Sequence, residues 1–151
     1  MENIEPLFRL YRDDVYRLAL SYTRSVPEAE DVCQNVFLKL MEQDTITPGK
    51  ERAWLMQVTA NQCRNLLRSS WWKKTEGLDV QLPAPEPRYQ ELWHSVMTLP
   101  PKYRVVIYLR YYEEYTTKEM ARLLKVSQSV VTTRLNRARM MLKQQLEEVS
   151  I

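Results

Sequence analysis

The placement of proline and glycine is the feature that most constrains how this chain folds. Its eight prolines and two glycines all fall between stretches with helical periodicity, and none interrupts such a stretch. Proline and glycine mark helix ends and turns, so the sequence predicts an all-α fold with no strands. The expected helices are 6–23, 28–43, 51–70, 89–98, 102–112, 117–124 and 128–147.

Two of these helices begin with the pattern of a capping box. The pattern is Ser25-x-x-Glu28 in one case and Thr116-x-x-Glu119 in the other. In such a box the hydroxyl and the carboxylate satisfy backbone amides of the first turn. Both sites therefore predict a helix start ahead of an amphipathic run.

A segment at 76–87 divides the chain. It contains three prolines and the acidic residues Glu76, Asp79 and Glu86, but no lysine or arginine. This composition predicts a flexible, extended acidic linker. Two small helical domains are expected on either side, at 1–75 and 88–151, and the 44% apolar content supports a packed core in each.

Composition excludes several classes of protein. No apolar run reaches the roughly 20 residues that cross a bilayer, and Glu2 and Glu5 stand where a secretion signal is basic and then apolar. A cytoplasmic protein without membrane insertion is expected.

Cys33 and Cys63 lack C-x-x-C spacing and His94 is the only histidine, so we expect reduced core thiols and no metal site.

Enzyme chemistry on nucleic acid would need groups that this sequence lacks. There is no cluster of Asp and Glu, no metal-ligand set and no phosphate-binding glycine loop. We therefore expect no catalytic residues and no cofactor.

The C-terminal half has the pattern of a helix-turn-helix, in which the short helix 117–124 is followed by a longer helix from Gln128. The net charge is only +3, but between Met120 and Leu146 every charged residue is basic. Charge alone also fits a solvated basic face. The second helix, however, has an apolar stripe that can pack on the first, formed by Val131, Leu135, Ala138 and Leu142.

The opposite side of that helix carries groups that hydrogen-bond base edges and phosphates in a major groove. Two adjacent threonines in mid-helix suit contact better than solvation, because β-branched residues are weak helix formers. The candidate DNA-binding residues are Gln128, Ser129, Thr132, Thr133, Asn136 and Arg137.

The helix expected at 51–70 also has two different faces. One face is mainly apolar: Leu55, Met56, Thr59, Ala60, Cys63, Leu66 and Leu67. The other mixes aromatic, amide and guanidinium groups, which suits unpaired DNA: Trp54, Gln57, Asn61, Arg64, Asn65 and Arg68, extended by Trp71, Trp72, Lys73 and Lys74. Taken alone, a tryptophan on a helix, such as Trp54, is more often a core residue than a nucleic-acid platform.

Several motifs along the chain stand in an order typical of one family. They are Ala29-Glu30-Asp31-Val-Cys-Gln34-Asn-Val-Phe37-Leu38-Lys, Ala53-Trp54-Leu55 with Asn61, Leu99-Pro100-x-x-Tyr-Arg104, Leu109-Arg110-Tyr111-Tyr112, Glu119-Met120-Ala121 and Val131-Thr-Thr-Arg134-Leu135-Asn-Arg137-Ala138-Arg139. Over nearly its whole length the chain resembles the extracytoplasmic-function (ECF) sigma factors of the sigma-70 superfamily. The resemblance implies that 1–75 is a sigma-2 domain for the minus-ten element and 88–151 a sigma-4 domain for the minus-thirty-five element.

The resemblance also implies partners. Core RNA polymerase would bind sigma-2 through the β′ clamp helices and sigma-4 through the β flap, and promoter DNA and an anti-sigma factor are expected as well. The residues implied for polymerase binding are Asp31, Gln34, Asn35 and Leu38. The expected function is promoter recognition, DNA opening and transcription initiation, with catalysis left to the polymerase. The alternative is a stand-alone helix-turn-helix transcriptional regulator, which would usually read paired half-sites as a dimer.

Three positions depart from the family pattern. The loop before Trp54 is only Asp44 to Glu51 and lacks the phenylalanine that the family often has there, which leaves capture of a flipped base by this loop open. Thr132 stands where the family often has a basic residue. Lys125 replaces a common turn glycine, at a cost of about 1 kcal/mol if the turn needs left-handed backbone.

Overall fold

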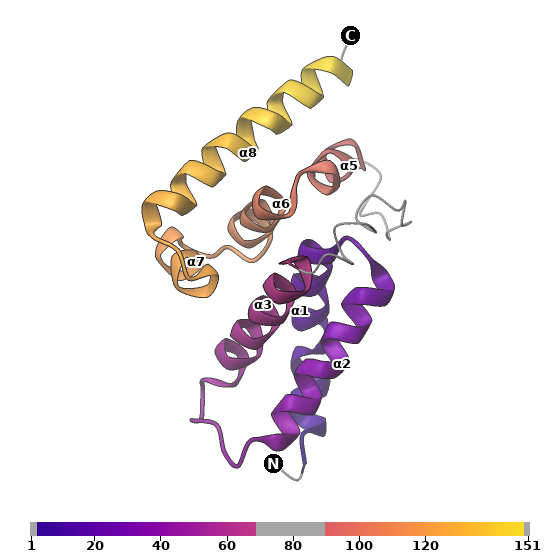
Figure 1. The fold of residues 1–151 in the computed structure, drawn as a ribbon, viewed down its shortest axis with the longest axis vertical. Helices are drawn as coiled ribbons and strands as arrows, with labels where there is room; N and C mark the ends of the chain where they lie inside the picture. Colours follow the sequence, from indigo (N-terminus) through magenta and orange to yellow (C-terminus); the bar gives the residue numbers. More distant parts are fainter. Residues whose placement is uncertain (1–2, 69–89, 150–151) are drawn as a thin grey trace. The chain divides into compact units, whose positions relative to one another are not determined.

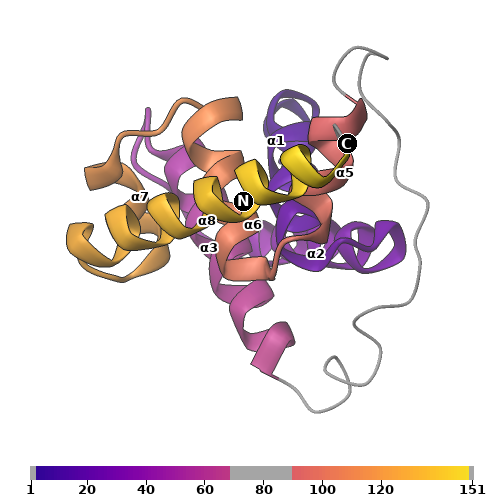
Figure 2. The same cartoon turned by 90° about the horizontal axis from the view of Figure 1, so that it is seen from above.

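The computed structural model describes residues 3–68 and 90–149, and every regular element in these ranges is helical (Figures 1 and 2). The chain divides into two compact units, Met1–Val80 and Gln81–Ile151. The all-α prediction is confirmed. The expected linker at 76–87 lies outside the described residues.

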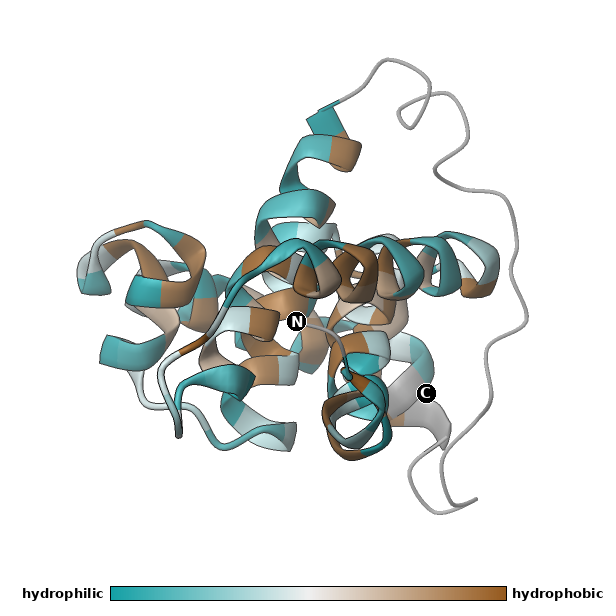
Figure 3. Ribbon diagram, turned by 90° about the horizontal axis from the view of Figure 1, so that it is seen from below, coloured by the Kyte–Doolittle hydropathy of each residue, from teal (hydrophilic) through white to brown (hydrophobic). Residues whose placement is uncertain are grey.

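The N-terminal unit is a bundle of α1 (Glu5–Thr23), α2 (Val26–Glu42) and α3 (Glu51–Arg68), in which each helix packs on the other two. Apolar and hydrophilic residues share each helix, so each has one side suited to the core (Figure 3). Phe8 on α1 and Phe37 on α2 meet edge to face with ring centroids 5.0 Å apart. The largest fully buried side chains here are Leu18, Leu40, Leu55, Met56, Val15 and Val36.

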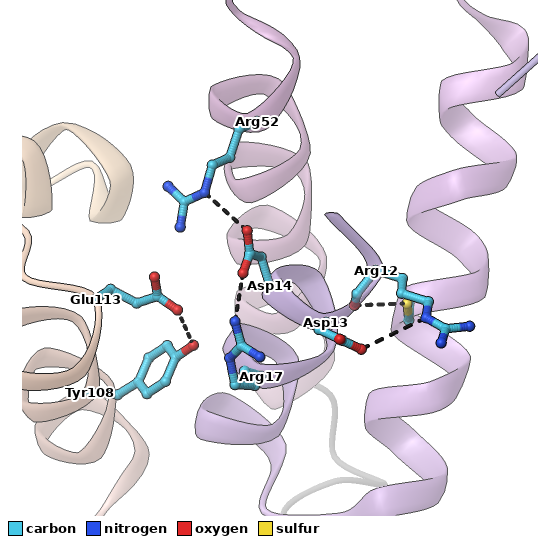
Figure 4. Close-up of polar contacts among 8 residues, drawn as sticks. Arg12, Asp13, Asp14, Arg17, Arg52, Tyr108 and Glu113 are labelled. Carbon is cyan, nitrogen blue, oxygen red and sulfur yellow. Dashed lines mark hydrogen bonds and ion pairs between the residues drawn. The ribbon is translucent and has the colours of Figure 1, made fainter. Parts of the chain in front are cut away.

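A carboxylate on α1 ties this bundle together across helices. Asp14 accepts a hydrogen bond from Arg17 at 2.6 Å and another from Arg52 on α3 at 3.1 Å (Figure 4). Cys33 on α2 donates from Sγ to the carbonyl oxygen of Arg12 at 3.8 Å, which links α2 to α1. These hydrogen bonds require specific geometry, so they help to fix how the three helices pack around an otherwise apolar core.

The start of α2 only partly follows the capping-box prediction. Ser25 caps the helix, because its Oγ accepts from the Glu28 amide at 3.4 Å. The Ser25 amide, however, donates to Thr23 Oγ1 at 3.3 Å, in the place that the Glu28 carboxylate takes in a full box. A hydroxyl two residues earlier thus competes with the predicted carboxylate.

The C-terminal unit contains α5 (Gln90–Thr98), α6 (Pro101–Ile107), η2 (Tyr108–Tyr112), α7 (Thr117–Leu124) and α8 (Gln128–Val149). Helices α5, α6 and α7 each pack on α8. The buried Arg104 donates to the carbonyl of Leu99 at 2.8 Å and closes the α5–α6 turn. The core residues with the least exposure are Leu99, Val105, Val106, Leu109, Met120, Val131, Leu135 and Ala138.

The helix expected at 102–112 has the right extent, but its last part, η2, is a π-helix. The amide of Glu113 donates to the carbonyl of Tyr108, five residues earlier, at 3.2 Å. The Tyr108 hydroxyl in turn donates to the Glu113 carboxylate (Figure 4). Apolar spacing alone does not separate this wider turn from an α-helix.

The start of α7 carries the complete capping box that the sequence predicts. The Glu119 amide donates to Thr116 Oγ1 at 3.1 Å, and the Thr116 amide donates to Glu119 Oε1 at 3.0 Å. The helix ends at Lys125 with φ 58° and ψ 44°, which is left-handed backbone. The strain foreseen for a non-glycine residue at this turn is therefore present.

We expect Asp14→Ala to lower the free energy of unfolding of the N-terminal unit by about 1–2 kcal/mol, because the half-buried carboxylate accepts from two guanidinium groups. Native-state hydrogen exchange of α1 and α3 amides measures the change. The control is Asp13→Ala, whose ion pair with Arg12 is exposed at 3.8 Å and should contribute no more than about 0.5 kcal/mol. Equal effects of both changes would contradict the stabilising role given to the two hydrogen bonds of Asp14.

We expect Lys125→Gly to stabilise the C-terminal unit by about 0.5–1 kcal/mol, since glycine adopts left-handed backbone without strain. Thermal unfolding followed through amide resonances of α7 and α8 tests this. Lys125→Ala removes the same side chain but keeps Cβ, so it should give no gain. A stabilised alanine variant would show that side-chain loss, not backbone strain, is responsible.

Candidate nucleic-acid and polymerase interfaces

Helix α8 is divided into a buried and an exposed face. Val131, Leu135, Ala138 and Leu142 are all buried, as are Met120, Ala121 and Leu124 on the adjoining α7. The predicted apolar stripe is confirmed. Because the stripe fixes the rotation of α8 about its own axis, the opposite side must face outward.

That opposite side, the α8 outer face, comprises Gln128, Ser129, Thr132, Thr133, Asn136 and Arg137, and all six residues are exposed. Ser127 directly precedes the helix, and its Oγ accepts from the Val130 amide at 3.1 Å. Its first turn carries no acid that would repel a phosphate. The face therefore combines hydroxyl, amide and guanidinium groups along one continuous strip.

Arg137 on α8 is a neighbour of Tyr103 on α6. A hydrogen bond from Arg137 is the main cause that lowers the pKa of the Tyr103 hydroxyl from 10.0; burial acts the other way and the charge of Lys102 adds to the lowering. The Lys102 ammonium lies 5.1 Å from the centre of the Tyr103 ring. No local sequence pattern signals that Tyr103 and Arg137 are neighbours, because they lie far apart in the chain and meet only through the packing of α6 on α8.

Helix α3 also buries the predicted side, with Leu55, Met56, Thr59, Ala60 and Cys63 in the core. Leu66 and Leu67, expected on the same side, are only half-buried. Burial raises the pKa of the Cys63 thiol, so this group stays protonated at neutral pH. Cys63 is a core residue as predicted, whereas Cys33 is only half-buried.

The α3 outer face comprises the predicted residues Trp54, Gln57, Asn61, Arg64, Asn65 and Arg68. Asn65 and Arg68 are exposed and the other four are half-buried. Asn61 Oδ1 accepts two hydrogen bonds, one from Gln57 Nε2 at 3.1 Å and one from Arg64. Trp54 is thus neither a core residue nor a fully exposed platform, and Trp71, Trp72, Lys73 and Lys74 lie outside the described residues.

The α2 outer face comprises Asp31, Gln34, Asn35 and Leu38, all exposed and opposite the buried Ala29, Val32, Val36 and Leu40. Leu38 is 56% exposed, which is high for a large apolar side chain. Met41, one turn further on, is also exposed and was missed by the sequence analysis, although its i+3 spacing from Leu38 signals the same face. Burial and then the charge of Asp31 raise the pKa of Glu28, in the first turn of α2.

The C-terminal unit has an apolar groove of about 780 Å³ between α5, the α6–η2 segment and α8. It is lined by Leu92, Val96, Ile107, Tyr111, Leu142 and Leu146, with Arg139, Lys143 and Glu147 at the polar positions. A groove of this composition fits an apolar side chain or a helix of a partner.

The described part of the chain contains neither a membrane-spanning helix nor a metal cluster. No helix in 3–68 and 90–149 combines the length and apolar character that crossing a membrane requires. His, Cys, Asp and Glu side chains in the same ranges form no group of three that could hold a metal ion.

Comparison with known proteins finds a family model that matches each of the two units. The family model "Sigma-70 region 2" matches residues 7–73, and "Sigma-70, region 4" matches residues 89–142. The chain therefore belongs to the sigma-70 family and is an ECF sigma factor with regions 2 and 4. It is a transcription initiation factor of RNA polymerase and not an enzyme. A stand-alone helix-turn-helix regulator would leave the match to region 2 unexplained.

Two Bacillus subtilis sigma factors are similar to this chain over most of their own length. The ECF RNA polymerase sigma factor SigM of Bacillus subtilis is 30% identical, with 93% of each chain covered. SigW of the same organism is 28% identical over 93% of this chain and 87% of its own. SigE of Mycolicibacterium smegmatis is 26% identical over 99% of this chain, which spans only 64% of SigE.

A solved structure shares the fold. It is the sigma factor RpoE of Bartonella quintana in complex with the anti-sigma factor NepR, with a TM-score of 0.75 and 16% identity. The similarity covers 97% of this chain and 98% of RpoE.

Proposed function

We propose that this chain binds core RNA polymerase and directs it to promoters by placing one domain on the minus-ten element and the other on the minus-thirty-five element. The domains are 1–75 and 88–151, with 76–87 as the linker. The observation that carries the proposal is that α3 and α8 each bury an apolar face and leave amide and guanidinium side chains on the opposite face. A cytoplasmic location belongs to the same proposal, because polymerase and promoter DNA are there.

The α8 outer face would enter the major groove of the minus-thirty-five element. Thr132 offers a methyl group and a hydroxyl where relatives often have a cation, so it suits contact with a thymine methyl. Arg137, which is exposed on this face, offers a guanidinium to a guanine or a phosphate. The preferred element should therefore differ from that of family members with a basic residue at 132.

The α3 outer face would hold the opened minus-ten element. The half-buried Trp54 ring supplies a surface on which a base can stack. Asn61 supplies an amide, and the exposed Arg68 supplies a cation for the DNA backbone. The preceding loop is short and braced, since the Gly49 amide donates to the Glu51 carboxylate at 2.9 Å.

The α2 outer face would dock on the clamp helices of β′, and the apolar groove of the C-terminal unit would receive the β flap. Support comes from the mixture of groups on α2, where acid and amide side chains surround the exposed Leu38 and Met41. Polar groups around an exposed apolar centre are typical of a protein interface. We include Met41 in this surface.

An anti-sigma factor is a further proposed partner. RpoE was solved with its anti-sigma factor NepR, and the exposed apolar residues on α2 would need covering whenever polymerase is not bound. Such a regulator would compete with polymerase for Leu38 and Met41.

The direct test is a purified system. The chain should co-elute with core RNA polymerase and support transcription from selected promoters, whereas core alone or the chain alone should not. Promoter binding by the isolated chain as a dimer, without effect on polymerase, would instead favour a stand-alone regulator.

We expect Leu38→Ala to weaken binding to core polymerase about tenfold, the effect of losing a central interface side chain. Titration of a labelled full-length chain with core polymerase measures the affinity. Leu10→Ala is the matched control, because Leu10 is a 65% exposed leucine on α1 of the same unit. If Leu10→Ala weakens assembly as much as Leu38→Ala, the α2 outer face is not the surface that binds core polymerase.

We expect Trp54→Ala, Asn61→Ala and Arg64→Ala to form closed promoter complexes but to open them poorly. Opening pays an unstacking cost of a few kcal/mol that these side chains would offset. Since Arg64 donates to Asn61, a variant that combines Asn61→Ala with Arg64→Ala should open promoters little less well than either single variant. Permanganate footprinting reports the unpaired thymines, and a premelted promoter should rescue much of the loss. Equal defects on premelted and duplex promoters would point to folding or polymerase docking.

A further inference from the structure

A chain of hydrogen bonds leads from η2 to the α8 outer face. Arg139 donates from Nε to the Tyr111 hydroxyl at 2.6 Å, and its guanidinium carbon lies 5.6 Å from the centre of the Tyr111 ring. The same guanidinium donates from a terminal nitrogen to Asn136 Oδ1 at 3.2 Å. Tyr111, in the π-helical turn, is therefore connected to an exposed amide on the surface proposed to read DNA.

The chemistry of this contact fixes the orientation of the Asn136 amide. A guanidinium has only donors, so the atom of Asn136 that faces Arg139 must be the carbonyl oxygen. The NH2 group is then directed away from Arg139 and toward solvent. In a major groove, that NH2 finds acceptors on guanine, on adenine N7 and on thymine O4, whereas cytosine offers a donor.

Tyr111 is what keeps Arg139 in this position. An exposed arginine has many rotamers, and ordering it costs conformational entropy. Tyr111 offsets that cost with two contacts at once, an accepting hydroxyl and an aromatic ring. Because Tyr111 is 58% exposed, its hydroxyl is not needed to complete a buried core.

The N-terminal unit contains the same local arrangement. In Asn61-x-x-Arg64 on α3, as in Asn136-x-x-Arg139 on α8, the arginine three residues later donates to the asparagine oxygen. The i, i+3 spacing brings the two side chains together on one helical face. An arginine-oriented amide thus occurs on both surfaces that are proposed to contact DNA.

We propose that Tyr111 is a positioning residue for minus-thirty-five recognition: through Arg139 it presents the Asn136 amide as a donor, so that the contacted base must offer an acceptor. The inference rests on the proposed function of the α8 outer face. It makes this position select against cytosine on the contacted strand.

The experiment uses holoenzyme assembled from the full chain and core polymerase, with duplex promoters randomised across the minus-thirty-five element. Tyr111→Phe keeps the ring and removes only the hydroxyl acceptor. Tyr112→Phe is the matched control, because Tyr112 is the adjacent, 62% exposed tyrosine and its ring stacks on Tyr108 at 5.4 Å. Asn136→Ala and the double variant with Tyr111→Phe complete a double-mutant cycle.

We expect Tyr111→Phe and Asn136→Ala to reduce base discrimination at one and the same position, by about fivefold for the loss of one hydrogen bond. Other positions should keep their preferences, and the double variant should match Asn136→Ala alone. Asn136→Asp, which replaces the donor with a second acceptor, should turn the preference at that position toward cytosine. Tyr112→Phe should behave as wild type.

Other outcomes would overturn the inference. A uniform loss of affinity at all sequences would mean that Tyr111 or Arg139 acts on the phosphate backbone. Weaker assembly with core polymerase, measured separately, would mean that Tyr111 acts in the apolar groove. If wild type selects a minus-thirty-five sequence and Tyr111→Phe is indistinguishable from Tyr112→Phe, only this inference fails. If wild type selects no such sequence, the proposed function fails with it.

Discussion

Burial of the apolar stripe of α8 is the constraint on which the C-terminal unit depends. Val131, Leu135, Ala138 and Leu142 pack against α7 and α6, and a fully buried Val or Leu contributes about 1.5–3 kcal/mol. This burial leaves α8 no freedom to rotate. The exposed hydroxyl, amide and guanidinium groups consequently keep a fixed direction, as recognition of a base edge requires.

The N-terminal unit uses the same principle on two helices that serve different partners. In α3 the buried side includes the small residues Ala60 and Cys63, which let the helix lie close to its neighbours and keep Asn61 and Arg64 at the surface. In α2 the buried side leaves Leu38 exposed. One small core thus orients a surface proposed for DNA and a surface proposed for polymerase, without either helix having to serve both.

Much of the fold could be predicted because helix ends and buried faces leave local signals in the sequence. The Thr116–Glu119 capping box and the stripe from Val131 to Leu142 both depend on spacings within one helix. The contacts that orient side chains on the outer faces do not depend on spacings within one helix. Tyr111 and Arg139 lie 28 positions apart, and their meeting depends on how η2 packs beside α8. The π-turn itself was missed because it changes hydrogen-bond partners without changing the apolar pattern.

The turn before α8 shows how stability and recognition compete at one residue. The amide of Val126 donates to the carbonyl of Ala121 at 3.1 Å, five residues earlier, and this bond requires left-handed backbone at Lys125. Glycine would satisfy the geometry at least cost, yet the chain has a lysine there. Lys125 is exposed and continues the exclusively basic stretch of the helix-turn-helix. A cation beside a phosphate strengthens binding to any DNA sequence in a salt-dependent way. In the proposed function, Lys125 would therefore add general affinity for DNA at the expense of backbone strain, while the specificity proposed for Asn136 depends on the unstrained helix that follows.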